Sequence, residues 1–98
     1  MKLLTKTIAL FAFLFAALLV HADIGPGGTG SVNGYQIGPG ADLSGADLSG
    51  AFLANANLND ANLSGANLVG AGLQNARLWR VDISGADLSD AHLMQADL

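Results

Sequence analysis

The sequence predicts an all-β solenoid, in which short β-strands joined by tight corners wind into stacked coils. Three observations lead to this prediction. Residues 41–98 repeat a five-residue unit without insertion, beginning ADLSG ADLSG AFLAN. The first residue is Ala in eleven of twelve units, and the third is Leu in eleven of twelve. The fourth and fifth positions are rich in Ser, Gly, Asn and Asp, the residues that favour turns.

A period of five suits neither an α-helix nor a continuous strand. In a helix the Leu would advance by a net angle of about 140° per unit and form no apolar face. In a strand the odd period would place successive Leu on opposite faces of the sheet. If the chain turns a corner of about 90° after each unit, Ala and Leu both point inward. Four units then close a square coil of about 20 residues, and coils stack about 4.8 Å apart.

The repeat unit Ala-(Asp/Asn)-Leu-x-x resembles the pentapeptide-repeat family. The resemblance runs from Ala41 to Leu98 and covers 58 of the 98 residues. It implies a right-handed quadrilateral β-helix, here of about three coils. It also implies one function, because some members of the family present an acidic rod that mimics DNA and inhibits topoisomerases.

Residues 1–22 have the organisation of a secretory signal peptide. Lys2 and Lys6 precede an apolar run over residues 8–20, and small residues at Val20 and Ala22 indicate cleavage after Ala22. An uncleaved membrane anchor is the alternative, but a membrane span needs about 20 apolar residues. We therefore predict a secreted or periplasmic protein that has no membrane attachment after cleavage.

Residues 23–40, DIGPGGTGSVNGYQIGPG, form either a Gly/Pro-rich linker or an N-terminal cap. The seven glycines make a fixed fold entropically costly, which favours a tether. Asn33-Gly34, however, is typical of a tight turn. In the cap alternative, Val32, Tyr35 and Ile37 form a short strand against the first coil and cover its open end.

The same segment contains a formal dinucleotide-binding pattern. Gly25, Gly27 and Gly30 match the spacing GxGxxG. That motif binds a cofactor only between a strand and a helix, and no helical pattern follows it here. We therefore predict no cofactor.

The chain after residue 22 is acidic, with two Arg against eight Asp and a net charge of −6. Nucleic-acid binding needs clustered Lys and Arg, so we predict no nucleic-acid partner. The sequence has no Cys and therefore no disulfide. The Asp and Asn at the second position of the units should form polar ladders that hydrogen-bond the corners. Their parallel side chains do not converge as a calcium site or an acid/base pair requires, so we predict no metal site and no enzyme activity.

Six outward residues depart from the repeat and form a candidate interaction patch. They fall on the third and fourth sides of the square coil: Phe52, Arg77, Trp79, Arg80, His92 and Met94. Trp and Arg are common at the energetic centres of interfaces. The alternative is that the arginines only form exposed ion pairs, such as Arg80 with Asp60 twenty residues earlier.

We therefore expect an exported structural or protein-interaction scaffold. Its partner would be another protein, or a second copy bound at the open coil end, because repeat proteins need polar caps and none follows the last unit. A shortened C-terminus is the alternative explanation. A DNA mimic is the competing function, although three coils reach only about 14 Å, against about 34 Å for one turn of DNA.

Overall fold

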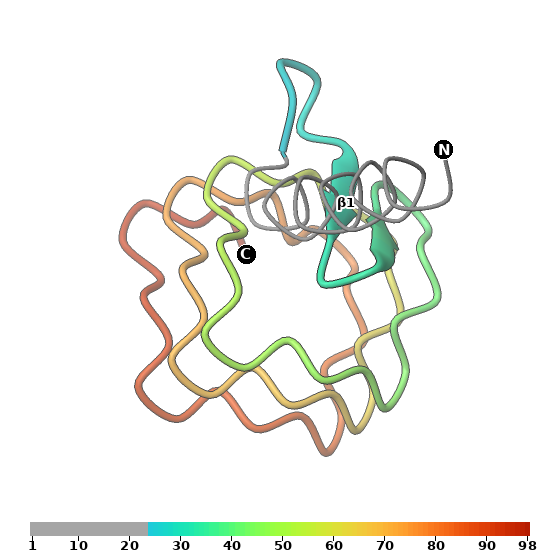
Figure 1. Ribbon diagram of the computed structural model, residues 1–98, viewed down its shortest axis with the longest axis vertical. Helices are drawn as coiled ribbons and strands as arrows, with labels where there is room; N and C mark the ends of the chain where they lie inside the picture. The colour runs from blue at the N-terminus through green and yellow to red at the C-terminus, as the bar shows by residue number, and fades with distance from the viewer. Residues whose placement is uncertain (1–23) are drawn as a thin grey trace, which may run out of the picture.

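The computed structural model describes residues 24–98, so the predicted signal peptide and its cleavage site after Ala22 lie outside the described residues. Two short strands, β1 (Gly30–Val32) and β2 (Tyr35–Ile37), precede a long coiled segment. Viewed along the coils, the chain traces a four-sided outline with its turns stacked behind one another (Figure 1). Within residues 24–98, no helix is long and apolar enough to cross a membrane.

The coiled segment is held in register by four parallel ladders, one on each side of the outline. Each ladder joins residues that lie twenty positions apart. We name the sides 1 to 4 in chain order: Asp42–Asn62–Asp82, Asp47–Asn67–Asp87, Phe52–Gly72–His92 and Asn57–Arg77–Asp97. The chain therefore returns to the same side after four units, as the period of five predicted.

Backbone hydrogen bonds connect each coil to the next. The Leu43 N–H donates to the Asn62 carbonyl at 2.7 Å, and the Asn62 N–H donates to the Ala41 carbonyl at 2.8 Å. At the corner, the Gly45 N–H donates to the Ser64 carbonyl at 2.8 Å. The same pattern recurs around the coil, so stacking satisfies the backbone groups that it removes from water.

Each unit ends in a tight corner that contains a residue with positive φ. At the first corner the Ala46 N–H donates to the Leu43 carbonyl at 3.1 Å, and Gly45 has a φ of 68°. A type II turn requires this conformation at its third residue, where Gly is unstrained and Asn is tolerated. Six corners have another residue at this position: Asn55, Asp60, Asn75, Arg80, Asp90 and Gln95.

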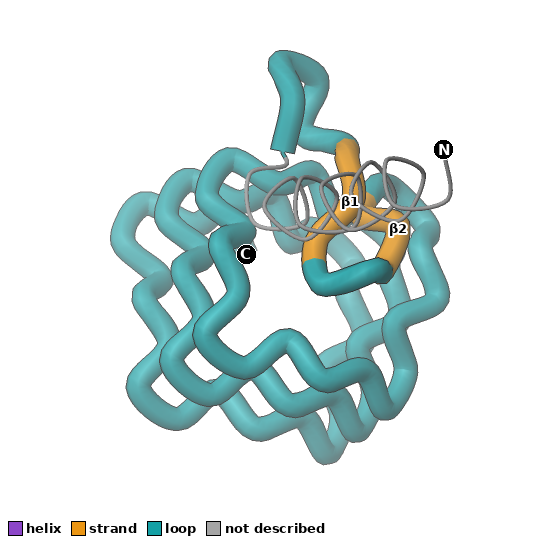
Figure 2. The backbone as a smooth tube through the Cα atoms, viewed as in Figure 1, coloured by secondary structure: helices purple, strands orange, loops and turns teal. Residues whose placement is uncertain are grey.

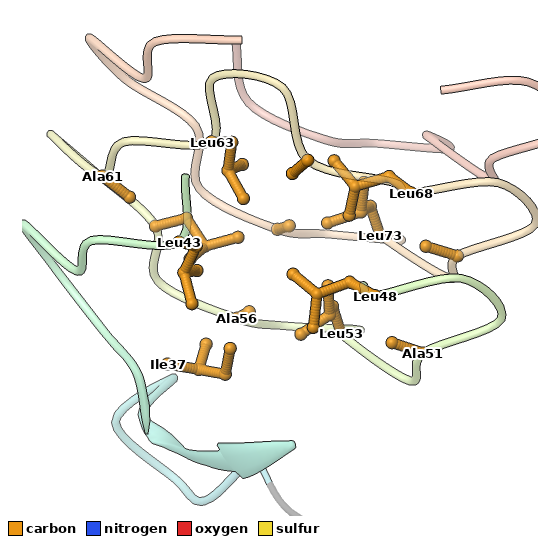
Figure 3. Close-up of a cluster of buried hydrophobic side chains, with 14 of the residues drawn as sticks. Ile37, Leu43, Leu48, Ala51, Leu53, Ala56, Ala61, Leu63, Leu68 and Leu73 are labelled. Atoms are coloured by element: carbon orange, nitrogen blue, oxygen red, sulfur yellow. The ribbon is translucent and has the colours of Figure 1, made fainter. Parts of the chain in front are cut away.

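The inward Leu and Ala side chains stack into one apolar core along the coil axis (Figure 3). Leu48, Leu53 and Leu58 of the first coil are all 0% exposed. In the last coil, in contrast, Ile83 is 40% exposed and Leu93 is 37% exposed. The core is therefore closed at its N-terminal end and open at the face that follows residue 80.

The N-terminal end is closed by a β-hairpin. β1 and β2 pair antiparallel with Val32 opposite Tyr35, and the connecting Asn33 and Gly34 both have positive φ, as a two-residue hairpin turn requires. Val32 and Ile37 are 1% and 3% exposed, and both belong to the core cluster. Figure 3 shows Ile37 beside the first coil. The two strands pair with each other because of the turn between them, whereas the sequence suggested one strand paired with the coil.

Candidate functional site

The polar ladders of sides 1 and 2 support the corners. The Asp42 Oδ1 accepts hydrogen bonds from the Ser44 N–H at 3.2 Å and the Ser44 hydroxyl at 2.8 Å. Asn62 accepts the same two bonds from Ser64. The serine hydroxyl, and then the serine N–H, lower the pKa of the Asp42 carboxyl below its ordinary value. These carboxylates therefore act within the fold, as the polar ladders predicted from the sequence would.

The acidic side chains of sides 1 and 2 are spread along their ladders. Within residues 24–98, no three His or Asp side chains lie close enough together to hold a metal ion. An Asn rung separates the Asp rungs on both sides 1 and 2. The arrangement is that of repeated corner caps rather than of a converging site.

Side 3 carries three members of the candidate interaction patch. Phe52 and Met94 are 67% and 73% exposed, and His92 is also exposed. Gly72 is the rung between Phe52 and His92, and a shallow groove of about 240 Å³ lies over it. Because Gly72 has no side chain, the aromatic ring of Phe52 has no neighbouring side chain on the next rung of its ladder.

Side 4 carries the other three members of the patch. Trp79 is 55% exposed, and its backbone N–H donates to the Asn59 side chain at 2.9 Å. Arg80 binds Asp60 through two bonds, Nε to Oδ1 at 2.7 Å and Nη2 to Oδ2 at 3.1 Å. The ion pair expected from the spacing of twenty residues is therefore present, and both partners are exposed.

The six patch residues do not form one continuous flat surface. Three lie on side 3 and three on side 4, and the corner residues Asn55, Asn75 and Gln95 run between the two sides. Arg77 occupies the middle rung of the side 4 ladder, whereas Arg80 lies at the corner that ends the same unit and binds Asp60. The structure thus divides the candidate patch into a side 3 group and a side 4 group.

A second groove, which the sequence did not predict, lies where the N-terminal loop meets the coils. It has a volume of about 620 Å³ and is lined by residues 24–28 on one side and by Asn55, Asn57, Asn75 and Arg77 on the other. The Gly28 carbonyl accepts a hydrogen bond from the Asn57 N–H at 2.7 Å, which holds the loop against side 4. No periodic signal encodes the path of this loop, so only the structure shows the groove.

The sequence profile described as pentapeptide repeats matches residues 40–73 and 61–98, with eight copies. The chain belongs to the pentapeptide-repeat family. Among curated proteins, none matches the chain significantly. The family membership agrees with the strand-only, β-helical architecture of the coiled segment.

Two crystal structures of pentapeptide-repeat proteins are similar to the chain. One is Rfr23 from the cyanobacterium Cyanothece 51142, with 43% identity and a TM-score of 0.59 over 59% of this chain and 40% of that protein. The other is a thylakoid lumen protein of Arabidopsis thaliana, with 44% identity and a TM-score of 0.55 over 56% of this chain and 38% of that protein. The chain therefore spans less than half the length of either relative.

Proposed function

We propose that this pentapeptide-repeat protein is an exported, non-enzymatic scaffold that binds another protein through its side 3 and side 4 groups. The observation that carries the proposal is the exposure of three large apolar side chains, those of Phe52, Trp79 and Met94, on an otherwise acidic chain. Burial of such a side chain contributes about 1.5–3 kcal/mol. Aromatic residues, Met and Arg are enriched at protein interfaces, and Trp and Arg at their hot spots, so these groups are suited to anchor a partner.

Export is the second part of the proposal. The basic start, apolar run and small residues of 1–22 support it, as does the thylakoid lumen origin of one structural relative. We further propose that the coiled segment is a right-handed β-helix of about three coils, as the family resemblance implies. Secreted or periplasmic fractions should contain a chain that begins at Asp23.

Contact through sides 3 and 4 is testable with a double variant. Trp79→Ala with Arg80→Ala should remove the partner that crosslinks to the wild-type protein in the exported fraction, while Val69→Ala on side 2 should keep it. Phe52→Asn, which restores the usual residue type of the repeat, tests side 3 separately. Thermal unfolding of each variant shows whether the fold is intact. Retention of every crosslinked partner in folded Trp79→Ala/Arg80→Ala and Phe52→Asn variants would contradict the proposal.

A second contact surface is the open face of the last coil, and its proposed partner is a second copy of the chain. A small apolar cavity of about 80 Å³ opens there, and its rim includes the partly exposed Ile83, Leu93 and Leu98. The mass of the protein in solution, measured by light scattering over a range of concentrations, tests this contact. A monomer at all concentrations would rule it out. Topoisomerase inhibition by a cytosolic form would instead support the DNA-mimic alternative.

A further inference from the structure

The groove between the N-terminal loop and side 4 is a concavity of the size that holds a small molecule. Figure 2 shows the loop that precedes β1 standing out from the four-sided outline. Residues 24–28 form one wall of the groove, and the corner between sides 3 and 4 forms the other. Its volume of about 620 Å³ lies within the range of small-molecule sites, which is about 300–1,000 Å³.

Arg77 contributes a positive charge to the lining of the groove. Among residues 24–98, Arg77 forms no ion pair, whereas the other arginine of this part, Arg80, is bound to Asp60. Asp97 occupies the next rung of the same ladder but makes no ion pair with Arg77 within the described chain. The Arg77 guanidinium therefore keeps its N–H donors available to a ligand.

The neighbouring side chains are amides that can add further donors. The Asn57 Oδ1 already accepts a hydrogen bond from the Asn59 N–H at 3.2 Å, so the donors of its amide group remain for a ligand. Asn55 and Asn75 are exposed corner residues, and within residues 24–98 their side chains form no hydrogen bond. The groove thus combines one positive charge with several neutral donors, and the lining residues from the described part of the chain include no carboxylate.

This set of groups matches a carboxylate. The planar guanidinium of Arg forms paired hydrogen bonds with the two oxygens of a carboxylate, and amide N–H groups bind the remaining lone pairs. The net charge of −6 over residues 23–98, with Asp97 one rung away, disfavours ions of higher charge such as phosphate. We propose that this groove binds a carboxylate group, with Arg77 as the charged anchor and the Asn57 amide as a second donor.

The proposal goes beyond the protein-binding function above and shares Arg77 with its side 4 group. Phe52, Trp79 and Met94 do not line the groove, and the variants that test it leave those residues unchanged. The Trp79→Ala/Arg80→Ala variant should therefore lose the crosslinked partner and keep carboxylate binding, so the two proposals can fail separately.

The test is an NMR titration of the protein with four small probes at constant ionic strength. N-acetylglycine represents a peptide carboxylate, acetate a free carboxylate, inorganic phosphate an anion of higher charge, and N-acetylglycinamide the neutral control. The carboxylate probes should cause saturable chemical-shift changes at four backbone N–H groups, and N-acetylglycinamide should not. These groups belong to Gly27, Gly28, Asn57 and Arg77. If N-acetylglycine binds more tightly than acetate, the natural source is a peptide; equal affinities indicate a free carboxylate, and both outcomes support the site.

Three variants make the test specific. Arg77→Asn restores a usual residue of the repeat, so it should keep the fold and weaken carboxylate binding by about tenfold or more. Arg80→Asn removes a positive charge outside the groove, and this variant should bind the carboxylate probes as tightly as the wild type does. Asp97→Asn should strengthen binding because it removes a nearby negative charge. Equal binding of N-acetylglycine by wild type and folded Arg77→Asn, or tighter binding of inorganic phosphate than of either carboxylate, would overturn the proposal.

Discussion

The backbone N–H of Asn57 donates a hydrogen bond of 2.7 Å to the carbonyl oxygen of Gly28. One coil further on, the Arg77 N–H donates to the Ala56 carbonyl at 2.8 Å. Gly28 thus supplies the acceptor that a preceding coil would otherwise supply. The N-terminal segment therefore closes the coil by hydrogen bonding as well as by burying Val32 and Ile37.

Gly28→Ala should destabilise the protein strongly. A Cβ atom at this position would lie 2.8 Å from the Asn57 nitrogen and 2.9 Å from the Asn55 carbonyl oxygen, and Gly28 has a φ of +79°. We expect a loss of about 2 kcal/mol or more in the free energy of unfolding, because the left-handed conformation alone costs about 1–2 kcal/mol. Urea denaturation measures it. Gly27→Ala is the matched control, since a Cβ there meets no atom within 4 Å. Equal stabilities of the two variants would contradict this account of the cap.

Tyr35→Phe should weaken the cap without changing its packing. The Tyr35 hydroxyl oxygen accepts a hydrogen bond from the Asp47 N–H at 3.3 Å. Asp47 lies in the first coil, so its N–H, like that of Asn57, has no carbonyl of a preceding coil as its acceptor. Removing the hydroxyl should cost about 0.5–1.5 kcal/mol and speed hydrogen exchange of the Asp47 amide. The Leu48 amide, which donates to the Asn67 carbonyl, is the internal reference. Unchanged exchange at Asp47 relative to Leu48 would show that the hydroxyl does not protect this group.

The stability of the fold should fall in acid because of the serine–aspartate pairs. Hydrogen bonds from serine lower the pKa of four carboxyls, those of Asp42, Asp47, Asp82 and Asp87. In the unfolded chain an Asp has a pKa of about 3.9, so the folded chain binds fewer protons just below that pH. The stabilisation is complete above the unfolded pKa and is lost as the pH falls through the lower, folded pKa values. The temperature of unfolding should therefore be steady above about pH 5 and decrease below about pH 4.

Replacing Asp82 and Asp87 with Asn should reduce this acid sensitivity. Asn62 shows that an amide accepts the same two bonds from its serine, so the double variant should keep the corners and lose the titrating groups. Asp97→Asn, at a position that accepts no serine hydrogen bond in the described chain, is the control. The unfolding temperatures of the double variant and the control are compared between pH 5 and pH 3. If both fall equally steeply, the serine–aspartate pairs are not the cause of the acid sensitivity.

Equivalent leucines should differ in their contribution to stability. Leu53 and Leu93 occupy the same position of the repeat on side 3, but Leu53 is 0% exposed and Leu93 is 37% exposed. Leu53→Ala should cost about 2–5 kcal/mol, and Leu93→Ala less than half as much. Chemical denaturation of both variants compares them. A cost at Leu93 equal to that at Leu53 would mean that the face of the last coil is covered in solution.

The ladders could be predicted from the sequence because every unit has the same pattern of inward, outward and turn residues. Ala and Leu occupy alternate positions within a unit, and the fourth and fifth residues turn the chain. Four such units make one coil of twenty residues, so Asp42 pairs with Asn62. The Arg80–Asp60 ion pair follows from the same count of twenty. A periodic sequence therefore specifies both the fold and the neighbours of each outward side chain.

The cap could be predicted only in part, and the groove could not be predicted. Asn33-Gly34 indicated a turn, and Val32 and Ile37 were apolar, but the contact of Gly28 with Asn57 depends on the path of a glycine-rich loop. The same loop creates the groove beside Arg77. The high glycine content leaves many paths open to an isolated chain, and packing against the coil selects one of them.

The hairpin makes the two ends of the coil inequivalent. At the end covered by β1 and β2, Val32 and Ile37 bury the core, and the Asp47 and Asn57 N–H groups have acceptors in Tyr35 and Gly28. Within the described residues, the face formed by the last coil exposes apolar side chains of the kind that a further coil would cover. The apolar core is therefore accessible to a stacked partner at this face and covered by the hairpin at the other. Two chains that associate face to face through the last coil would form a closed pair, because each then covers the core of the other.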